Sequence, residues 1–527
     1  MNAAELIAPQ LVNRRDIPAL VDAASATWTF GDLDDAASRL ATYFRASGLG
    51  VGDAVLVLVP MSPALYVIIL ATLRAGLVAT FVSPSAGRAE VSRWCAVVGP
   101  RAVIGTPRAH VWARTIGALR AIPSQLSTGL GLPGVWPWRR IAALAPWTGV
   151  VDVSEDATAL LTPTSGSTGD PMLCARTHGV LRAQYDALQR SLDLVPGMKD
   201  LCTLPLFVLM NRASGVTTLL PNVDLRRPAT ANPRRLLRQI EQHRPRRLTA
   251  APGLLERLVD HCASHGNRLN VEQIFTGGAP VFPQLIHRLR DAAPISRIVA
   301  LYGATEAEPI ATMDVEQVRD QDWQAMSDGA GLLAGTPVAS VDLRIMRDQW
   351  GRPMGPLTTS QFNDLCLPTD HPGEIVVTGA HVIRSRGRPE HDARMKIAVG
   401  GDEWHRTGDA GRLDEQGRLW LLGRCTARFG SGDGVPYPLS VEACAMADPS
   451  VQRAALIATH GERILVVQLR PREQPNGVPL GKRVAWAKVD RIAVVRRIPV
   501  DRRHNAKIDY VRLESMLRHL APAGAGP

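Results

Sequence analysis

The sequence alternates short apolar runs with longer segments of helical periodicity, and this alternation limits the possible folds more than any other feature. Up to residue 302 the runs expected as strands are 55–59, 78–82, 101–105, 159–162, 247–250, 274–277 and 297–302. Helical patterns lie between or beside them over 63–76, 253–264 and 283–292. Strands that alternate with helices are typical of parallel sheets covered by helices. This part of the chain is therefore predicted to form parallel α/β layers.

The pattern changes at about residue 338. The next runs have the length and turn residues of antiparallel strands and cover 341–345, 373–379 and 417–423. Short strands expected beyond Arg424 cover 454–459, 463–469 and 491–496. We predict an α/β fold whose large N-terminal domain, residues 1–424, adds a small antiparallel barrel-like subdomain to the parallel layers. Residues 425–527 are predicted to form a small mobile α+β domain with a disordered tail over 521–527.

The length and composition are those of a globular protein with more than one domain. The 527 residues include 46% hydrophobic and 21% charged residues. The net charge of +11 comes almost entirely from arginine. We expect a solvated basic surface, with attraction for polyanionic substrates or an anionic membrane surface as the alternative. No nucleic-acid module is present, so nucleic acid is not an expected partner.

Cysteine usage and hydropathy predict a cytoplasmic protein. Seven cysteines lie far apart without a CxxC pair, which favours reduced thiols over disulfides or a zinc site. The N-terminus lacks the order of a signal peptide. The longest apolar stretch, Tyr66 to Val82, is interrupted by Arg74 and Gly76. It predicts a buried helix that leads into a strand, and no transmembrane segment is expected.

The stretch T-S-G-S-T-G combines hydroxyl side chains with glycines, directly after a run expected as a buried strand. Glycine tolerates positive φ, so several backbone amides can turn inward and bind phosphate oxygens. A flexible linker is the alternative, and the buried strand argues against it. The predicted phosphate loop consists of Thr164, Ser165, Gly166, Ser167, Thr168 and Gly169. It ends at Met172, where a cation would serve better, and Arg176 is a nearby candidate to replace that cation.

Three further segments strengthen this interpretation. L301-Y-G-A-T-E306 places an aromatic ring, a hydroxyl and a carboxylate at the end of a predicted strand. H405-R-T-G-D409 places an acid in a predicted tight turn that could hold ribose hydroxyls, and R502-R-H-N-A-K-I508 carries one lysine near the C-terminus. Each alone could be a strand cap, an exposed turn or a solvated lysine. Their occurrence together, in this order, indicates a nucleotide site.

Together these segments resemble the adenylate-forming superfamily of acyl-CoA synthetases, carrier-protein adenylation domains and luciferases, over nearly the whole chain. The resemblance implies a nucleotide site for ATP and Mg²⁺, with the 164–169 loop on the phosphates. The implied adenine and magnesium motif comprises Tyr302, Gly303, Thr305 and the metal ligand Glu306, and the implied adenine-stacking segment comprises Gly278, Ala279 and Pro280. It further implies that Asp409 binds ribose and that Arg424 lies at the domain junction. Lys507 is implied to contact the carboxylate and the α-phosphate during adenylation.

A closer resemblance, to the olefin β-lactone synthetase branch, rests on segments 404–420, 432–442, 500–508 and the P-L-F-V-L run from Pro205. That branch converts a 2-alkyl-3-hydroxy fatty acid and ATP into a β-lactone, AMP and pyrophosphate without CoA. The resemblance implies a long-chain hydroxy acid as substrate and partner enzymes of a hydrocarbon or lactone pathway. Its implied acyl pocket, for which plain core packing is the alternative, comprises Phe207, Val208, Leu209 and Met210.

Two departures from the superfamily pattern keep other functions open. Met172 stands where the family usually has a lysine, and Thr426 stands where it has a hinge aspartate. A nucleotide-binding scaffold without turnover is therefore one alternative. An acyl-CoA or carrier-protein ligase that uses the same acyl-AMP is the other. No residue is singled out as the base for ring closure; His405 is a candidate, with a structural histidine as the alternative.

Overall fold

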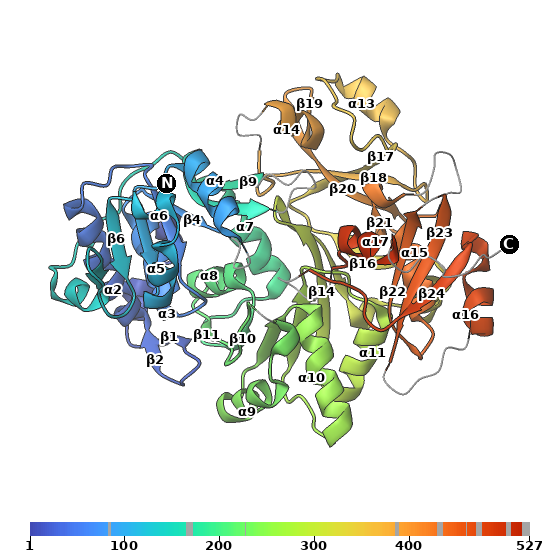
Figure 1. The fold of residues 1–527 in the computed structure, drawn as a ribbon, viewed down its shortest axis with the longest axis horizontal. Helices are drawn as coiled ribbons and strands as arrows, with labels where there is room; N and C mark the ends of the chain where they lie inside the picture. The colour runs from blue at the N-terminus through green and yellow to red at the C-terminus, as the bar shows by residue number, and fades with distance from the viewer. Residues whose placement is uncertain are drawn as a thin grey trace. The chain divides into compact units, whose positions relative to one another are not determined.

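The protein is described by a computed structural model (Figure 1). The described residues are 1–82, 86–164, 172–226, 228–384, 389–428, 436–459, 461–470, 477–501 and 507–518. The predicted tail and most of the predicted phosphate loop, residues 165–171, lie outside them. Contacts divide the chain into two compact units. The first unit comprises Met1–Arg226, Arg234–Thr249 and Thr305–Glu308, and the second comprises Arg227–Pro233, Ala250–Ala304 and Pro309–Pro527.

The first sheet of the first unit is mostly parallel. Its strands are β3 (Ala54–Leu58), β4 (Val78–Phe81), β5 (Ala102–Gly105), β6 (Ser124–Ser127), β7 (Trp136–Pro137), β8 (Thr158–Thr164) and β9 (Met172–Thr177). The helices of this part are α2 (Phe30–Ala46), α3 (Pro63–Arg74), α4 (Arg88–Val98), α5 (Pro107–Ala113) and α6 (Gly117–Arg120). The strand order is β7-β6-β5-β3-β4-β8-β9, and β8 and β9 pair antiparallel. Helix α3 is apolar and buried along its length and leads into β4, as predicted for the longest apolar stretch.

A second group of strands in the first unit runs in the order β12-β10-β11-β1-β2. These strands are β1 (Pro18–Val21), β2 (Thr27–Thr29), β10 (Lys199–Cys202), β11 (Thr217–Leu219) and β12 (Arg247–Ala250). The accompanying helices are α1 (Ala8–Asn13), α7 (His178–Leu192), α8 (Pro205–Ala213) and α9 (Pro233–His243). Helix α7 begins directly after β9, with Thr177 as its N-cap. It buries Val180, Leu181, Leu188 and Leu192.

The second unit continues with parallel strands and then becomes antiparallel. Its strands run in the order β13-β14-β15-β16-β21-β20-β18-β17. They are β13 (Gln273–Gly277), β14 (Arg297–Ala304), β15 (Ala307–Asp314), β16 (Leu332–Pro337), β17 (Asp342–Met346), β18 (Gly373–Thr378), β19 (Lys396–Val399, beside β20), β20 (Asp402–Leu413) and β21 (Leu419–Arg424). The helices are α10 (Pro252–His265), α11 (Pro283–Ala292), α12 (Asp320–Ser327), α13 (Thr359–Leu365) and α14 (Pro389–Met395). The predicted bounds of β13, β14, β17, β18 and β21 differ from the observed ones by at most two residues, whereas β15, β16, β19 and β20 were not predicted as strands.

The C-terminal part of the second unit is a three-stranded sheet between helices. Its elements are α15 (Pro438–Met446), β22 (Val451–Thr459), β23 (Glu462–Leu469), α16 (Gly477–Arg483), β24 (Arg491–Val495) and α17 (Tyr510–Arg518). Residues Leu456 and Leu465 of the sheet pack with α15 and α16, whereas Ile457 and Val466 pack with α17. The sheet therefore has one apolar core on each face. This mixed α/β structure, with a large N-terminal sheet domain and a smaller C-terminal part, confirms the predicted fold class; the predicted domain boundary after Arg424 stays a prediction.

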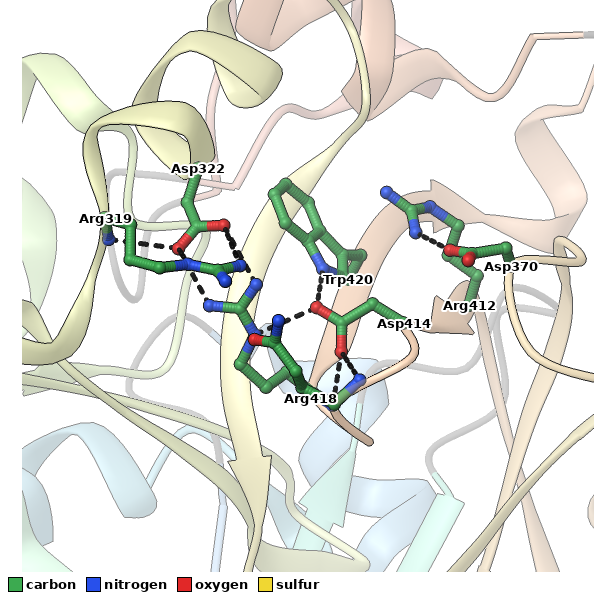
Figure 2. A network of polar contacts seen from close by, with 8 residues as sticks. Arg319, Asp322, Asp370, Arg412, Asp414, Arg418 and Trp420 are labelled. Atoms are coloured by element: carbon green, nitrogen blue, oxygen red, sulfur yellow. Dashed lines mark hydrogen bonds and ion pairs between the residues drawn. The ribbon is translucent and has the colours of Figure 1, made fainter.

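A network of ion pairs holds the hairpin between β20 and β21 (Figure 2). Arg418 donates to both carboxylate oxygens of Asp322 on α12, at 2.8 and 2.9 Å, and to Asp414 at 2.9 Å. The indole of Trp420 donates to the same Asp414 at 2.9 Å. Arg319 also pairs with Asp322, and these two guanidinium groups lower the pKa of the Asp322 carboxyl. The network fixes the turn that joins the two strands on which the candidate site is built.

Candidate functional site

The carboxyl ends of β13 and β14 lie at the same edge of the sheet. The two strands are parallel, with Gly277 opposite Leu301; β13 ends at Gly277, and β14 continues through Tyr302 to Ala304. A Cβ atom on Gly277 would lie 2.7 Å from the carbonyl oxygen of Leu301, which excludes a side chain there. Gly278 has a φ of 84°, which few residues other than glycine adopt. The two glycines thus let the chain turn away at an edge where α/β sheets commonly bind ligands.

Tyr302 contacts two residues of the antiparallel strands. Its hydroxyl donates to Oδ2 of Asp409 at 2.9 Å, and Nε of Arg424 lies 3.1 Å from Oδ1 of the same carboxylate. Asp409 and Arg424 are cross-strand partners on β20 and β21, so the sheet register itself brings them together. Partial burial, together with the nearby Asp409 carboxylate, raises the pKa of Tyr302 well above its usual value. The tyrosine is therefore a hydrogen-bond donor at neutral pH.

The segment around Asp409 corrects one prediction. H405-R-T-G-D409 was expected to form a tight turn, but all five residues lie in β20. Gly408 has a φ of 67°, and the pairing of β20 with β18 shifts register between Arg406 and Ala410, on either side of this glycine. The segment forms a strand and not a turn because this irregularity accommodates the positive φ of the glycine without interrupting the strand. The amide of Asp409 donates to Oγ1 of Thr407 at 3.1 Å, which helps to orient the acid.

The other polar residues of this segment are structural. Arg406 is fully buried and forms two hydrogen bonds with Glu374 on β18, Nε to Oε1 at 2.9 Å and Nη2 to Oε2 at 2.7 Å. His405, named above as a candidate base, has only 1% of its surface exposed and lies within the same strand. This burial favours the structural histidine. Of the motif, Asp409 alone presents a partly exposed carboxylate, 17% accessible.

The Asp409 carboxylate fits a ribose. A carboxylate has about four acceptor positions, and Tyr302 and Arg424 occupy two of them with one bond to each oxygen. The carboxylate is partly exposed, so its remaining acceptor positions can take two hydroxyl donors. A vicinal diol presents two such donors. The arrangement can therefore hold a nucleoside, with Tyr302 and the 278–280 segment beside it on the neighbouring strand ends.

In the first unit, two side chains of strand β9 contact the carbonyl oxygen of Thr305. Nη2 of Arg176 donates to that oxygen at 2.8 Å, and Sγ of Cys174 lies 3.7 Å from it. Nη1 of Arg176 donates to Oγ1 of Thr162 on β8 at 3.1 Å. Gln184 on α7 donates to the carbonyl oxygen of Glu308 at 3.0 Å. Residues 305–308 are thus held from two elements that follow the predicted phosphate loop in sequence.

The predicted metal site consists of one carboxylate. Glu306 is half-buried and follows Thr305 directly. Among the described residues, no group of three or more His, Cys, Asp or Glu side chains is arranged to hold a metal ion. Mg²⁺ commonly binds through one or two carboxylates together with substrate phosphates and water. A single glutamate therefore fits Mg²⁺ that arrives with a nucleotide and does not fit a metal held by protein alone.

The remaining predicted residues are less informative. Lys507 is exposed, and its amide donates to Oδ1 of Asp501 at 3.0 Å. Phe207, Val208 and Met210 are buried in α8, and Leu209 and Met210 line a cavity of about 20 Å³. That volume holds about one water molecule and no acyl chain. The acyl pocket and the role of Lys507 stay predictions.

The sequence of residues 8–385 matches the model of the AMP-binding enzyme family. The chain belongs to this family. It is 29% identical to the olefin β-lactone synthetase of Xanthomonas campestris pv. campestris and 30% identical to that of Stenotrophomonas maltophilia, each over 93% of this chain and 91% of the relative. The fold is similar to that of the amide bond synthetase McbA from Marinactinospora thermotolerans, with a TM-score of 0.80 and 22% identity over 98% of this chain and 99% of the other. It is equally similar to ATP-bound MatB from Rhodopseudomonas palustris, with a TM-score of 0.80 and 20% identity over 99% and 100%.

Membership of this family confirms the adenylate-forming superfamily inferred from the motifs, and with it an AMP-forming ligase. No described helix combines the length and the apolar composition that a bilayer crossing requires. The roles of the individual site residues stay predictions. Sequence reasoning missed two sets of contacts: the hydrogen bond of Tyr302 to Asp409, and the contacts of Cys174 and Arg176 with the carbonyl oxygen of Thr305. Neither could have been found from a local pattern, because the contacts join residues more than 100 positions apart.

Proposed function

We propose that this ligase converts a 2-alkyl-3-hydroxy fatty acid and ATP into a β-lactone, AMP and pyrophosphate. The observation that carries the proposal is the similarity to two olefin β-lactone synthetases over 93% of this chain and 91% of each relative. The Tyr302–Asp409–Arg424 cluster supports it, because the carboxylate can accept hydrogen bonds from a ribose diol. The partner enzymes of a hydrocarbon or lactone pathway belong to the same proposal.

The first step forms an acyl-AMP. An oxygen of the substrate carboxylate attacks the α-phosphorus of ATP, the bond from that phosphorus to the bridging oxygen breaks, and pyrophosphate leaves. Asp409 would hold the ribose, and Lys507 would offset charge on the carboxylate and the α-phosphate. Mg²⁺, held by Glu306 together with the phosphates, would neutralise part of their charge. The 164–169 loop would bind the departing pyrophosphate.

The second step closes the ring. The 3-hydroxyl oxygen of the acyl-AMP forms a bond to the acyl carbon, its proton leaves to water, and AMP departs with the bridging oxygen. Both reacting groups belong to one molecule, so the protein must mainly hold them in a reactive geometry and exclude competing water. No external thiol takes part.

An acyl-CoA ligase is the second candidate, because the chain is also 26% identical to 4-coumarate–CoA ligase 5 of Oryza sativa over 85% of its length. One assay separates the candidates. The protein is incubated with ATP and a 2-alkyl-3-hydroxy fatty acid, with and without CoA, and the products are identified by mass. A lactone without CoA supports the proposal, whereas a thioester formed only with CoA replaces it. The absence of AMP in both reactions indicates a scaffold.

Two controls sharpen this assay. A 2-alkyl acid without the 3-hydroxyl should give acyl-AMP and no lactone, since the internal nucleophile is missing. The Lys507→Ala variant should release no pyrophosphate yet remain folded, because the side chain is exposed. Lys482→Ala, which removes another exposed lysine of the C-terminal part, should behave as the wild type. Normal pyrophosphate release by Lys507→Ala would contradict the assignment of that residue.

A further inference from the structure

The stretch from Thr164 to Met172 carries no positive side chain. Its nine residues, T-S-G-S-T-G-D-P-M, include one aspartate and neither lysine nor arginine. Backbone amides and hydroxyls can bind phosphate oxygens, but the charge that accumulates on a polyphosphate during transfer also needs cations nearby. If this loop binds the phosphates of ATP, the positive charge must come from outside the loop.

Strand β9, which begins where the loop ends, places a buried cation four residues further on. Arg176 is 5% exposed and shares one face of β9 with Cys174, since both side chains reach the carbonyl oxygen of Thr305. The register of β8 with β9 sets Thr164 opposite Met172 and Leu160 opposite Arg176. The antiparallel pairing of β8 with β9 thus fixes the position of Arg176 along its strand relative to Thr164, where the loop begins.

The partners of Arg176 are neutral. Its guanidinium donates to the hydroxyl of Thr162 and to the carbonyl of Thr305, and no carboxylate of the described residues forms an ion pair with it. Three other buried arginines are paired with carboxylates, Arg74 with Asp34, Arg247 with Asp200 and Arg406 with Glu374, whereas Arg212 on α8 shares with Arg176 the lack of such a partner among the described residues. Taking a charge out of water costs several kcal/mol unless an opposite charge compensates. A buried cation without a counter-ion is therefore suited to meet an anionic ligand.

We propose that Arg176 is a positioning residue for the polyphosphate of ATP. It fixes the carbonyl of Thr305, and with it the backbone that carries Glu306, and it supplies the positive charge that residues 164–172 lack. This inference rests on the proposed use of ATP, and it depends neither on the acid substrate nor on lactone formation. It also assigns a cause to Met172, because with Arg176 present a second cation at that position is not required.

Equilibrium binding of MgATP and of AMP tests the proposal without any turnover. Arg176→Met should weaken MgATP binding at least about tenfold, because a buried charge-assisted contact is lost. AMP, which lacks the β- and γ-phosphates, should bind within about twofold of the wild type. Arg176→Lys should fall between the two, since it keeps the charge and loses the two-pronged hydrogen bonding. Arg190→Met, an exposed arginine on α7 of the same unit, is the matched control and should change neither affinity.

A double-mutant cycle with Met172→Lys makes the test stricter. In the wild type the new lysine should leave MgATP affinity unchanged or lower it, because Arg176 already supplies the positive charge. In the Arg176→Met background the same lysine should restore affinity about tenfold. A change of sign between the two backgrounds is expected only if both positions serve one anion.

The outcomes separate this inference from the proposed function. Equal losses of MgATP and AMP affinity, or unchanged MgATP affinity in Arg176→Met, would overturn the role of Arg176 while the use of ATP stands. A wild type that binds AMP but not MgATP would overturn the proposed function itself. If Arg176→Met does not fold, as judged by circular dichroism, Arg176→Lys decides. Its MgATP affinity must then fall by more than its AMP affinity.

Discussion

Two buried arginines of the first unit show how differently the same side chain can be accommodated. Arg247 on β12 is fully buried, and its guanidinium donates to Asp200 and Asn211 at 3.0 Å and to the carbonyl of Leu192 at 2.9 Å. Arg176 on β9 is almost as buried, yet its partners are one hydroxyl and one carbonyl. The first arginine is neutralised by the sheet that contains it. The second has no carboxylate partner among the described residues.

The Asp200 network explains why Arg247 is structural. Asp200 and Arg247 are directly opposite each other on the parallel strands β10 and β12. Asn211 donates to Asp200 at 2.8 Å and Thr249 donates to it at 3.0 Å, so the carboxylate has several donors besides the arginine. Such a network is complete without a ligand. The comparison shows that burial alone does not determine how an arginine is compensated: Arg247 has a carboxylate partner, whereas Arg176 has none among the described residues.

We expect the largest loss of stability for a variant that breaks the ion pair between Arg247 and Asp200. Arg247→Met leaves Asp200 as a buried carboxylate without its cation and should lower the free energy of unfolding by about 3–5 kcal/mol. Arg176→Met breaks no ion pair and should lower it by roughly 1 kcal/mol or less. Urea unfolding of both variants beside the wild type measures the difference. Equal losses of unfolding free energy would show that the two arginines contribute to stability in the same way.

A similar comparison can be made for a buried carboxyl group, whose contribution to stability depends on pH. Glu442 on α15 is 2% exposed and accepts hydrogen bonds from the hydroxyl of Tyr510 at 2.6 Å and the amide of Leu456 at 3.0 Å. Burial raises the pKa of this carboxyl from 4.5 to about 7. A raised pKa means that the folded state binds the proton more tightly. The stability contribution is therefore full below pH 4.5 and is lost as the pH rises through 7.

Unfolding free energies at pH 6 and pH 8 test this prediction. The wild type should be less stable at pH 8, by an amount of at most about 3 kcal/mol over the whole titration, and Glu442→Gln should remove the difference. Asp322 provides the contrast, because Arg418 and Arg319 lower the pKa of its carboxyl, so its contribution is lost only in acid (Figure 2). A Glu442→Gln variant with the same dependence between pH 6 and 8 as the wild type would refute the account.

Replacement of Asp409 should weaken the binding of both AMP and MgATP, whereas replacement of Arg176 should weaken the binding of MgATP alone. Asp409→Ala removes acceptors for the ribose hydroxyls, and one charge-assisted hydrogen bond contributes about 1.5–3 kcal/mol. AMP and MgATP carry the same ribose, so both affinities should fall by a similar factor. Calorimetric titration of the variant with each nucleotide checks this. If both dissociation constants are unchanged, Asp409 serves the sheet and not the ligand.

The smallest effect is expected at a third buried arginine. Arg212 on α8 is fully buried, its Nε and Nη2 atoms have no hydrogen-bond partner, and it borders the cavity of about 20 Å³. Burial lowers its pKa to about 10, and its guanidinium lies 4.5 Å from the ring centroid of Tyr66. Replacement of a poorly compensated charge by an apolar side chain of similar length should change stability by about 1 kcal/mol or less, in either direction. A thermal shift measures this, and a loss as large as that of Arg247→Met would contradict the comparison.

The sequence predicted the family and part of the secondary structure because these rest on local patterns, although strands such as β6, β15 and β16 were not predicted. Helix α11 begins and ends where the apolar periodicity predicted, and the strand predicted over 297–302 continues two residues further, to Ala304. The error at residues 405–409 arose because a glycine beside an aspartate signals a turn locally, whereas pairing with β18 and β21 is set by distant residues. The Tyr302–Asp409 bond joins residues 107 positions apart, so no local pattern contains it.

The most direct measurement follows labelled oxygen from the acid to AMP. The substrate is a 2-alkyl-3-hydroxy fatty acid with ¹⁸O in both carboxylate positions, incubated with ATP and the protein in ordinary water without CoA. Attack of the carboxylate on the α-phosphorus transfers one ¹⁸O atom to AMP, and attack of the unlabelled 3-hydroxyl leaves the other in the lactone carbonyl. The account predicts singly labelled AMP and a singly labelled lactone. Unlabelled AMP, or AMP that appears together with the free acid alone, would contradict it.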